Sequence, residues 1–167
     1  GNWRWATGML VRLALCAAAY LGIVVVVSVA TPQRFAKIGE NQCSDDWCIA
    51  VAGVIRGSSS AGVLYDVSFR VSSRAIRVVQ REHNVVVYLL DGVGRRYDAD
   101  RSPDGAPFDV SLEPGQAVST TRHFVVPAGA RDVRLVISRE GGVPTPECCV
   151  IGAEGSLLHK RTMVRLG

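Results

Sequence analysis

The sequence lacks the short motifs by which many enzymes and cofactor-binding proteins are recognised. It has no Gly-x-Ser-x-Gly elbow, no Ser-x-x-Lys pair and no Cys-x-x-Cys-His for attached haem. The glycines of GVGRRYD do not lie between a strand and a helix, as a phosphate-binding loop requires. No pair of carboxylates is set apart by its surroundings as an acid and a base. We therefore predict that the protein is not an enzyme, with no catalytic residue and no cofactor.

An excess of charge of one sign is also missing. The chain has 19 basic and 15 acidic residues, and two of the basic ones, Arg4 and Arg12, lie near its start. The rest of the chain therefore has 17 basic against 15 acidic residues, a net charge of +2. This excess is too small to indicate a nucleic-acid partner. There is no run of like charge, no low-complexity tract and no convincing internal repeat.

Only three histidines are available for acid–base chemistry. His123 lies in an expected strand, whereas His83 and His159 lie in charged segments. None has a recognisable nucleophile or orienting partner in the sequence. We interpret all three as surface or hydrogen-bonded side chains without a catalytic role.

The sequence does contain a long apolar run near its start. Residues 13–31 carry no charge, and as a helix they would extend about 28 Å, close to the hydrocarbon thickness of a bilayer. The alternative is a secretion signal, because Arg4 and Arg12 precede the run and Ser28-Val29-Ala30 resembles a cleavage site. A signal's apolar part is usually only about 7–15 residues long. We predict a retained transmembrane helix at 13–31, preceded by a short N-terminal segment at 1–12.

Small side chains recur along one face of this predicted helix. A stripe of small residues lets helix backbones approach closely within a membrane, although alanine and glycine are also common in spans that face lipid. Aromatic and basic side chains near the start suit the membrane interface. The candidate packing face is Ala14, Ala18 and Gly22, and the candidate interfacial anchors are Trp3, Trp5, Arg4 and Arg12.

Four of the five cysteines follow the apolar run. They are Cys43, Cys48, Cys148 and Cys149. An even number of cysteines in a domain that follows a membrane anchor favours disulfides in an oxidising compartment. Adjacent cysteines chelate a metal poorly, so we predict no metal site. These cysteines place the N-terminus in the cytoplasm and the residues after about Gln33 outside it.

The disulfide pairing has two alternatives. A bridge from Cys43 or Cys48 to Cys148 or Cys149 would join the two ends of the domain and close a loop of about 100 residues, the more stabilising arrangement in the chain-entropy model. A local Cys43–Cys48 bridge beside a vicinal one contributes less.

After Pro32 the pattern changes from helical to strand-like. Pro32 ends the helix, residues 32–46 are interpreted as a tether, and Tyr65 to Val71 alternate apolar and polar side chains. Helical spacing is limited to a short piece around 74–81. The other short runs, separated by Gly, Pro, Ser and Asp, are 47–55, 63–73, 84–91, 107–112, 116–127, 132–140 and 161–166. We predict an all-β, antiparallel sandwich over 47–167.

Two sequence elements within this region resemble those of a known domain family. A strand ends in an Asp-x-x-Gly turn before a short strand with tyrosine, and a later Pro-Gly-x-x-Val turn opens a strand that closes on Phe-x-Val-Pro. The matching residues are Asp91, Gly94, Tyr97, Pro114, Gly115, Val118, Phe124, Val126 and Pro127. Over about 47–140 the chain resembles bacterial extracellular immunoglobulin-like domains of the telokin-like immunoprotective type. The resemblance implies a sandwich displayed outside the membrane and supplies no catalytic residue.

These observations lead to two functional hypotheses. The first is a non-catalytic accessory or structural subunit of a bacterial membrane complex, held in the inner membrane by one helix, with lipid and other membrane subunits as partners and a periplasmic sandwich packed on them. A photosynthetic reaction centre or a respiratory assembly is one hypothesis for that complex. The alternative is a free-standing anchored periplasmic module that binds a peptide, a sugar or an envelope protein.

Overall fold

The computed structural model describes residues 2–100, 104–139 and 161–166, which belong to two compact units. The first unit contains the helix α1 (Asn2–Ala30). Within it, Trp5–Ala30 has a mean hydropathy of 2.5 and is long and apolar enough to cross a membrane. By length and composition this helix fits a membrane anchor or a signal sequence.

The helix α1 is longer than the predicted span. It begins at Asn2 rather than at residue 13, because the residues between Trp5 and Val11 are also mainly apolar and include no helix breaker other than Gly8. It ends at Ala30, where the Thr31 amide and hydroxyl both donate to the carbonyl oxygen of Val27, at 2.9 and 2.7 Å, before Pro32.

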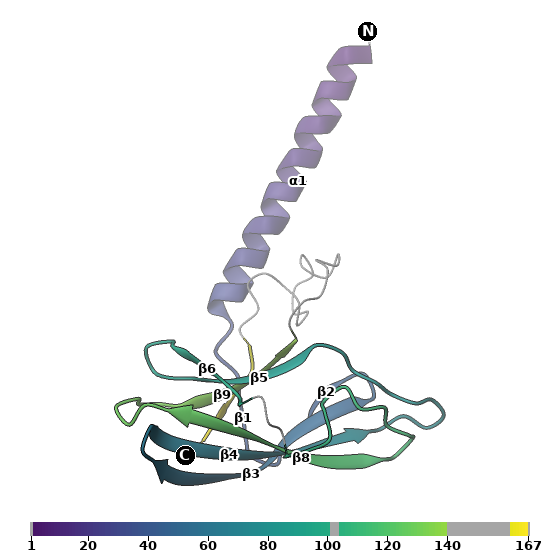
Figure 1. The fold of residues 1–167 in the computed structure, drawn as a ribbon. Helices are drawn as coiled ribbons and strands as arrows, with labels where there is room; N and C mark the ends of the chain where they lie inside the picture. Colours follow the sequence, from purple (N-terminus) through teal and green to yellow (C-terminus); the bar gives the residue numbers. More distant parts are fainter. Residues whose placement is uncertain (1, 101–103, 140–160, 167) are drawn as a thin grey trace. The chain divides into compact units, whose positions relative to one another are not determined.

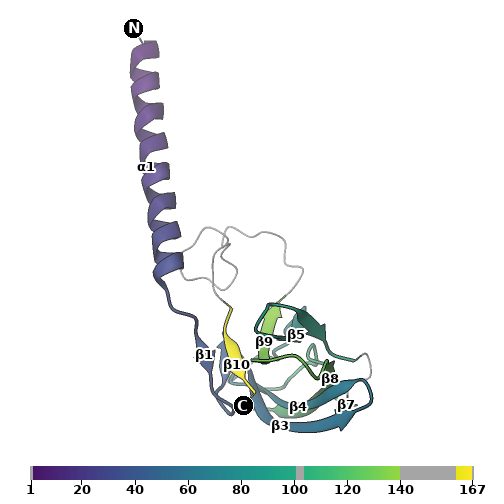
Figure 2. The same cartoon turned by 90° about the vertical axis from the view of Figure 1, so that its left-hand side faces the viewer.

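The second unit is a β-sandwich. Its described strands form two five-stranded sheets, which lie face to face in Figures 1 and 2. Sheet A has the order β1 (Phe35–Ala36), β10 (Met163–Arg165), β9 (Arg134–Arg139), β5 (Val85–Leu90) and β6 (Arg96–Asp98). Sheet B has the order β2 (Gln42–Ser44), β3 (Trp47–Ser59), β4 (Gly62–Ser73), β8 (Ala117–Val126) and β7 (Asp104–Gly105). The pairs are antiparallel except β1 with β10.

The alternation in β4 explains how one sheet covers the core. Tyr65, Val67, Phe69 and Val71 are all buried, whereas the residues between them are not. Successive side chains of a strand point to opposite faces, so this pattern turns one face of the sheet inward. At the centre, the rings of Phe69 and Phe108 meet edge to face, with centroids 5.3 Å apart. The predicted fold class, an all-β immunoglobulin-like sandwich after one N-terminal helix, is confirmed.

Three local predictions are wrong. Residues 74–81 form no helix and instead connect β4 to β5 as an irregular segment. Residues 107–112 form no strand, and only Leu112 pairs, through an isolated bridge to Gln80. The predicted tether at 32–46 contains β1 and β2. These strands are two or three residues long, and β1 depends on pairing with β10 from the far end of the chain, so no local pattern could indicate it.

Candidate functional site

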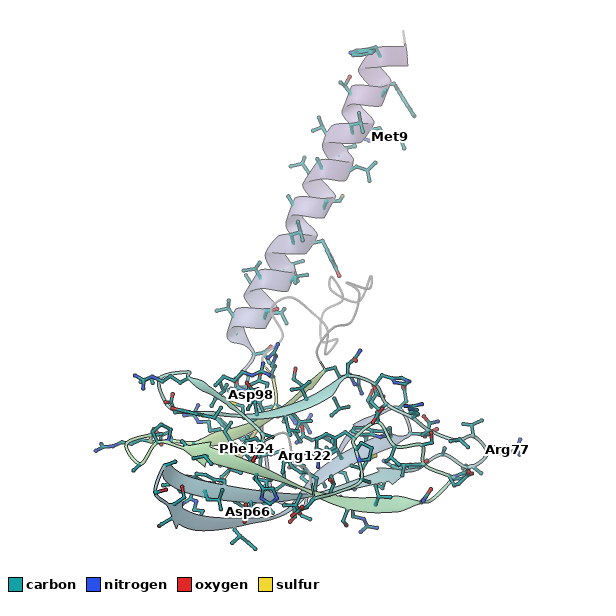
Figure 3. All side chains as sticks on the ribbon, viewed as in Figure 1. Met9, Asp66, Arg77, Asp98, Arg122 and Phe124 are labelled. Carbon is teal, nitrogen blue, oxygen red and sulfur yellow. A yellow bond between two sulfur atoms is a disulfide. The ribbon has the colours of Figure 1, made fainter. Side chains whose placement is uncertain are left out.

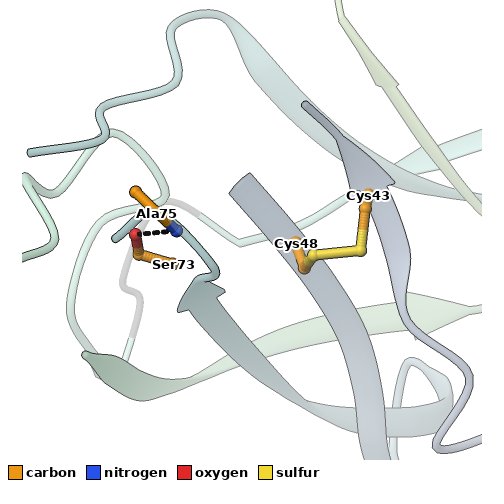
Figure 4. Close-up of a disulfide and its surroundings, with 4 residues drawn as sticks. All are labelled: Cys43, Cys48, Ser73 and Ala75. Atoms are coloured by element: carbon orange, nitrogen blue, oxygen red, sulfur yellow. Dashed lines mark hydrogen bonds between the residues drawn. A yellow bond between two sulfur atoms is a disulfide. The ribbon is translucent and has the colours of Figure 1, made fainter. Parts of the chain in front are cut away.

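The cysteines of the β2–β3 hairpin are joined to each other. Cys43 and Cys48 lie directly opposite on neighbouring antiparallel strands, with Cα atoms 4.0 Å apart, and form a disulfide (Figure 4). This is the local alternative, so a bridge from either residue to the far end of the domain is excluded. The hairpin's tight turn brings the pair together before any long-range contact is needed. Cys148 and Cys149 lie outside the described residues.

Asp91 organises the predicted Asp-x-x-Gly turn. Its Oδ1 accepts from the amides of Val93 and Arg95 at 3.0 and 2.9 Å, and its Oδ2 accepts from the Tyr97 hydroxyl at 3.0 Å. Burial alone would raise the pKa of Asp91, but these hydrogen bonds outweigh it and hold the pKa below its usual value. These three hydrogen bonds all join residues within six positions of Asp91, so they shape the turn.

His123 lies between two carboxylates on the outer face of sheet B. Its Nδ1 is 2.6 Å from Asp66 Oδ1 on β4, and its Nε2 is 3.1 Å from Asp104 Oδ2 on β7 (Asp66 is labelled in Figure 3). The hydrogen bond to Asp66 is the main cause that raises the pKa of His123. Because both ring nitrogens face carboxylates, neither activates a hydroxyl group as a base would.

The cluster of His123, Asp66 and Asp104 is not arranged to bind a metal ion. The two carboxylates lie on opposite sides of the imidazole, so the three side chains do not converge on one point. Among the described residues, no group of three or more His, Cys, Asp or Glu side chains has the arrangement of a metal site. His83 is exposed and His159 lies outside the described residues.

The charge on His123 predicts a pH dependence of stability. A raised pKa in the folded state stabilises the protein below the unfolded pKa of about 6.5, and this contribution is lost as the pH rises through the folded pKa. Relative to His123→Gln, the wild type should therefore be more stable at pH 5.5, by up to about 1 kcal/mol, and the difference should shrink by pH 8.5. Thermal unfolding at the two pH values measures it. A difference that is constant or grows with pH would contradict the ion pair.

Arg122 is buried on the inner side of β8 and lines an open hollow. Its side chain is only 7% exposed, and its guanidinium lies 4.3 Å from the centre of the Phe108 ring. The hollow has a volume of about 280 Å³. Its lining comes from both sheets and the segments near β6 and β7, and consists of Val85, Val86, Val87, Asp98, Ala99, Asp100, Phe108 and Arg122 (Figure 3 labels Asp98 and Arg122).

Arg122 was not among the candidate residues predicted from the sequence. The feature that could have indicated it is the alternation of side chains along β8. Arg122 lies two residues before the buried Phe124 and four before the buried Val126, so all three side chains point to the same face. A charged residue on the inward face of a strand is uncommon and indicates a paired or functional group.

The segment between β4 and β5 exposes several aliphatic side chains. Ile76, Val78 and Val79 are 88, 57 and 53% exposed, and Arg74 and Arg77 lie beside them in the sequence. Figure 3 places Arg77 at one end of the sandwich. Single exposed aliphatic residues are ordinary, but three within four residues form an apolar surface of the kind found at binding sites.

The predicted helix-packing face is accessible within α1. Ala14, Ala18 and Gly22 are exposed, and a Cβ atom added to Gly22 would meet nothing within 4 Å. The predicted anchors Trp3 and Trp5 are 84 and 81% exposed. Their contact with a neighbouring helix or with lipid stays a prediction.

Comparison with known proteins gives a fold and no family. No protein-family model and no curated protein matches the chain. An uncharacterized β-sandwich protein from Clostridium difficile 630 is similar in structure, with a TM-score of 0.52 and 11% identity over 82% of this chain and 96% of that one. A second similar structure is the secreted protein MPT63 of Mycobacterium tuberculosis, with a TM-score of 0.49 and 12% identity over 66 and 93%.

The first of these similarities shows a β-sandwich. At this level of identity it assigns neither an activity nor a ligand, because one fold supports many functions. The finer resemblance to the telokin-like type stays a prediction.

Proposed function

We propose that this chain is a non-catalytic accessory subunit, held in a bacterial inner membrane by α1, whose periplasmic β-sandwich binds a neighbouring protein of a membrane complex. The observation that carries the proposal is the exposed surface of Ile76, Val78 and Val79. The core of the sandwich is filled without these side chains, so burying them against a partner is favourable by roughly 25 cal/mol per Å² of apolar area.

Two further observations support the proposed orientation and partner. The Cys43–Cys48 disulfide fits an oxidising compartment and thus a periplasmic domain. Arg74 precedes the three aliphatic residues and Arg77 lies between Ile76 and Val78, both exposed, so the surface suits a partner that combines apolar and acidic groups. That the complex is photosynthetic or respiratory stays a prediction.

The proposal is tested by recovery of the complex after extraction in mild detergent. We expect wild-type protein to elute as a high-mass complex with other membrane subunits. Ile76→Asp places a charge at the most exposed of the three side chains and should lower recovery of the partner by about tenfold or more, because burying an unpaired carboxylate at the interface costs more than about 1.4 kcal/mol. The matched control is Val93→Asp, at a side chain 77% exposed on another turn.

The helix is tested in the same assay. Gly22→Leu enlarges the small-residue face without lowering hydrophobicity and should weaken a helix–helix contact by roughly five- to 150-fold, whereas Ile23→Leu should not. Equal recovery of Gly22→Leu and the wild type would mean that this face meets lipid. A monodisperse small species for the wild type itself would reject the subunit proposal and favour the free-standing module.

A further inference from the structure

Arg122 is a buried cation whose hydrogen-bond partners among the described residues are all uncharged. Nη1 donates to the Thr120 hydroxyl and to the Thr121 carbonyl oxygen, the latter at 3.0 Å, and Nη2 donates to the Ala106 carbonyl oxygen at 3.4 Å. Among the described residues, none pairs a carboxylate with this guanidinium. Burial lowers the pKa of Arg122, which reflects the cost of holding its charge away from water. A buried charge without a counter-ion is a position where an anion is favoured.

The hydrogen bonds also leave donors available. A guanidinium has five N–H groups, and Arg122 uses three of them on the neutral partners. The other two are bound by none of the described residues, and two is the number with which arginine binds a carboxylate through parallel hydrogen bonds. The three existing bonds hold the side chain in place, so a ligand would meet a preorganised group.

One part of the lining is apolar and suits the hydrocarbon body of a ligand. Val85, Val87 and Phe108 supply hydrocarbon and aromatic surface beside the cation. A volume of about 280 Å³ lies near the lower end of the range for ligand pockets, roughly 300 Å³, which suits a small ligand.

The two acidic residues in the lining do not exclude an anion. The Asp98 carboxylate is bound by Arg96 Nε at 2.7 Å, so its charge is matched. Asp100 is exposed, so solvent screens its charge. The charge of Arg122 differs from both, because no carboxylate among residues 2–100, 104–139 and 161–166 pairs with it and its burial limits screening by solvent.

We propose that this hollow binds a small apolar carboxylate, with its carboxylate on Arg122 and its hydrocarbon part against Val85, Val87 and Phe108. The same chemistry is provided by a free branched or aromatic acid and by the C-terminal carboxylate of a peptide that ends in an apolar residue. This inference is independent of whether the chain joins a larger complex.

The test is calorimetric titration of the full chain in detergent micelles, with a micelle-only blank. Isovalerate represents the free acid, N-acetylvaline represents the peptide terminus, and isovaleramide is the uncharged control for both. We expect at least one acid to bind and the amide to bind at least tenfold more weakly, because the amide lacks the charge that the guanidinium recognises. The stronger of the two acids identifies the source.

Three variants decide whether the hollow is the site. Arg122→Gln should weaken binding by about ten- to 100-fold. Ala99→Leu should fill the hollow and abolish binding while every hydrogen bond of Arg122 is kept, which makes it informative even if Arg122→Gln fails to fold. Arg70→Gln, at an exposed arginine of the same sheet, should bind as the wild type does. No binding of either acid at millimolar concentration, equal binding of the amide, or unchanged binding by Ala99→Leu would overturn the proposal.

Discussion

Replacing Phe69 by alanine is expected to lower the free energy of unfolding of the sandwich by about 3–5 kcal/mol. The Phe69 side chain is 0% exposed and packs its ring edge to face against Phe108. Its loss removes a large buried apolar surface and leaves a cavity that the two sheets close only in part. Chemical denaturation of the full chain in detergent, followed by the near-ultraviolet signal of the domain, measures the change.

The matched control for this prediction is the next residue. Arg70 points to the other face of β4 and is exposed, so Arg70→Ala should change stability by less than about 0.5 kcal/mol. Comparable losses for the two variants would mean that the alternation of β4 does not place Phe69 in the core. Phe69 also supports Phe108, so Phe69→Ala should additionally weaken ligand binding beside Arg122.

Replacing Gly62 by alanine should also destabilise the sandwich. Gly62 follows the β3–β4 turn with φ of +144°, and a Cβ atom added there would lie 2.3 Å from the carbonyl oxygen of Val126. Side chains rarely adopt this backbone conformation, and the contact is with backbone rather than with a flexible side chain. The β4–β8 pairing must shift, so we expect a loss of at least about 1–3 kcal/mol in the same denaturation experiment.

Gly57 provides the comparison in the same hairpin. A Cβ atom at Gly57 would meet the Leu64 side chain at 3.8 Å, an ordinary van der Waals distance. Gly57→Ala should therefore be neutral or slightly stabilising, because alanine restricts the unfolded chain more than glycine does. If Gly62→Ala were as stable as Gly57→Ala, the strand pairing described at this turn would be wrong.

The two surfaces of the sandwich proposed to bind differ in chemistry. The segment of Ile76, Val78 and Val79 is apolar and exposed, which suits a protein partner, whereas the hollow beside Arg122 is small and suits a single small ligand. Ile76→Asp should reduce recovery of the protein partner without changing carboxylate binding, and Ala99→Leu should abolish carboxylate binding without changing recovery of the partner. This pair of results would show that the two sites are separate.

Features that depend on local sequence were predictable. The apolar run of the helix, the alternation from Tyr65 to Val71 and the turns at Asp91 and Pro114 follow from hydrophobicity, side-chain period and turn preferences of neighbouring residues. The all-β sandwich followed from the number and spacing of the strand-like runs. These patterns can be identified in the sequence because the spacing of apolar side chains and the residues of a turn lie close together in the chain.

The tertiary structure alone decided what depends on distant partners. The two-residue strand β1 forms because β10 lies beside it, and the segment at 74–81 is not helical although its spacing suggested a helix. Arg122 became a candidate site only because the fold buries its guanidinium and, within the part of the chain that the structure describes, gives it only uncharged hydrogen-bond partners. Pairing, burial and charge environment are set by residues far apart in the chain, and a single sequence does not state which of them meet.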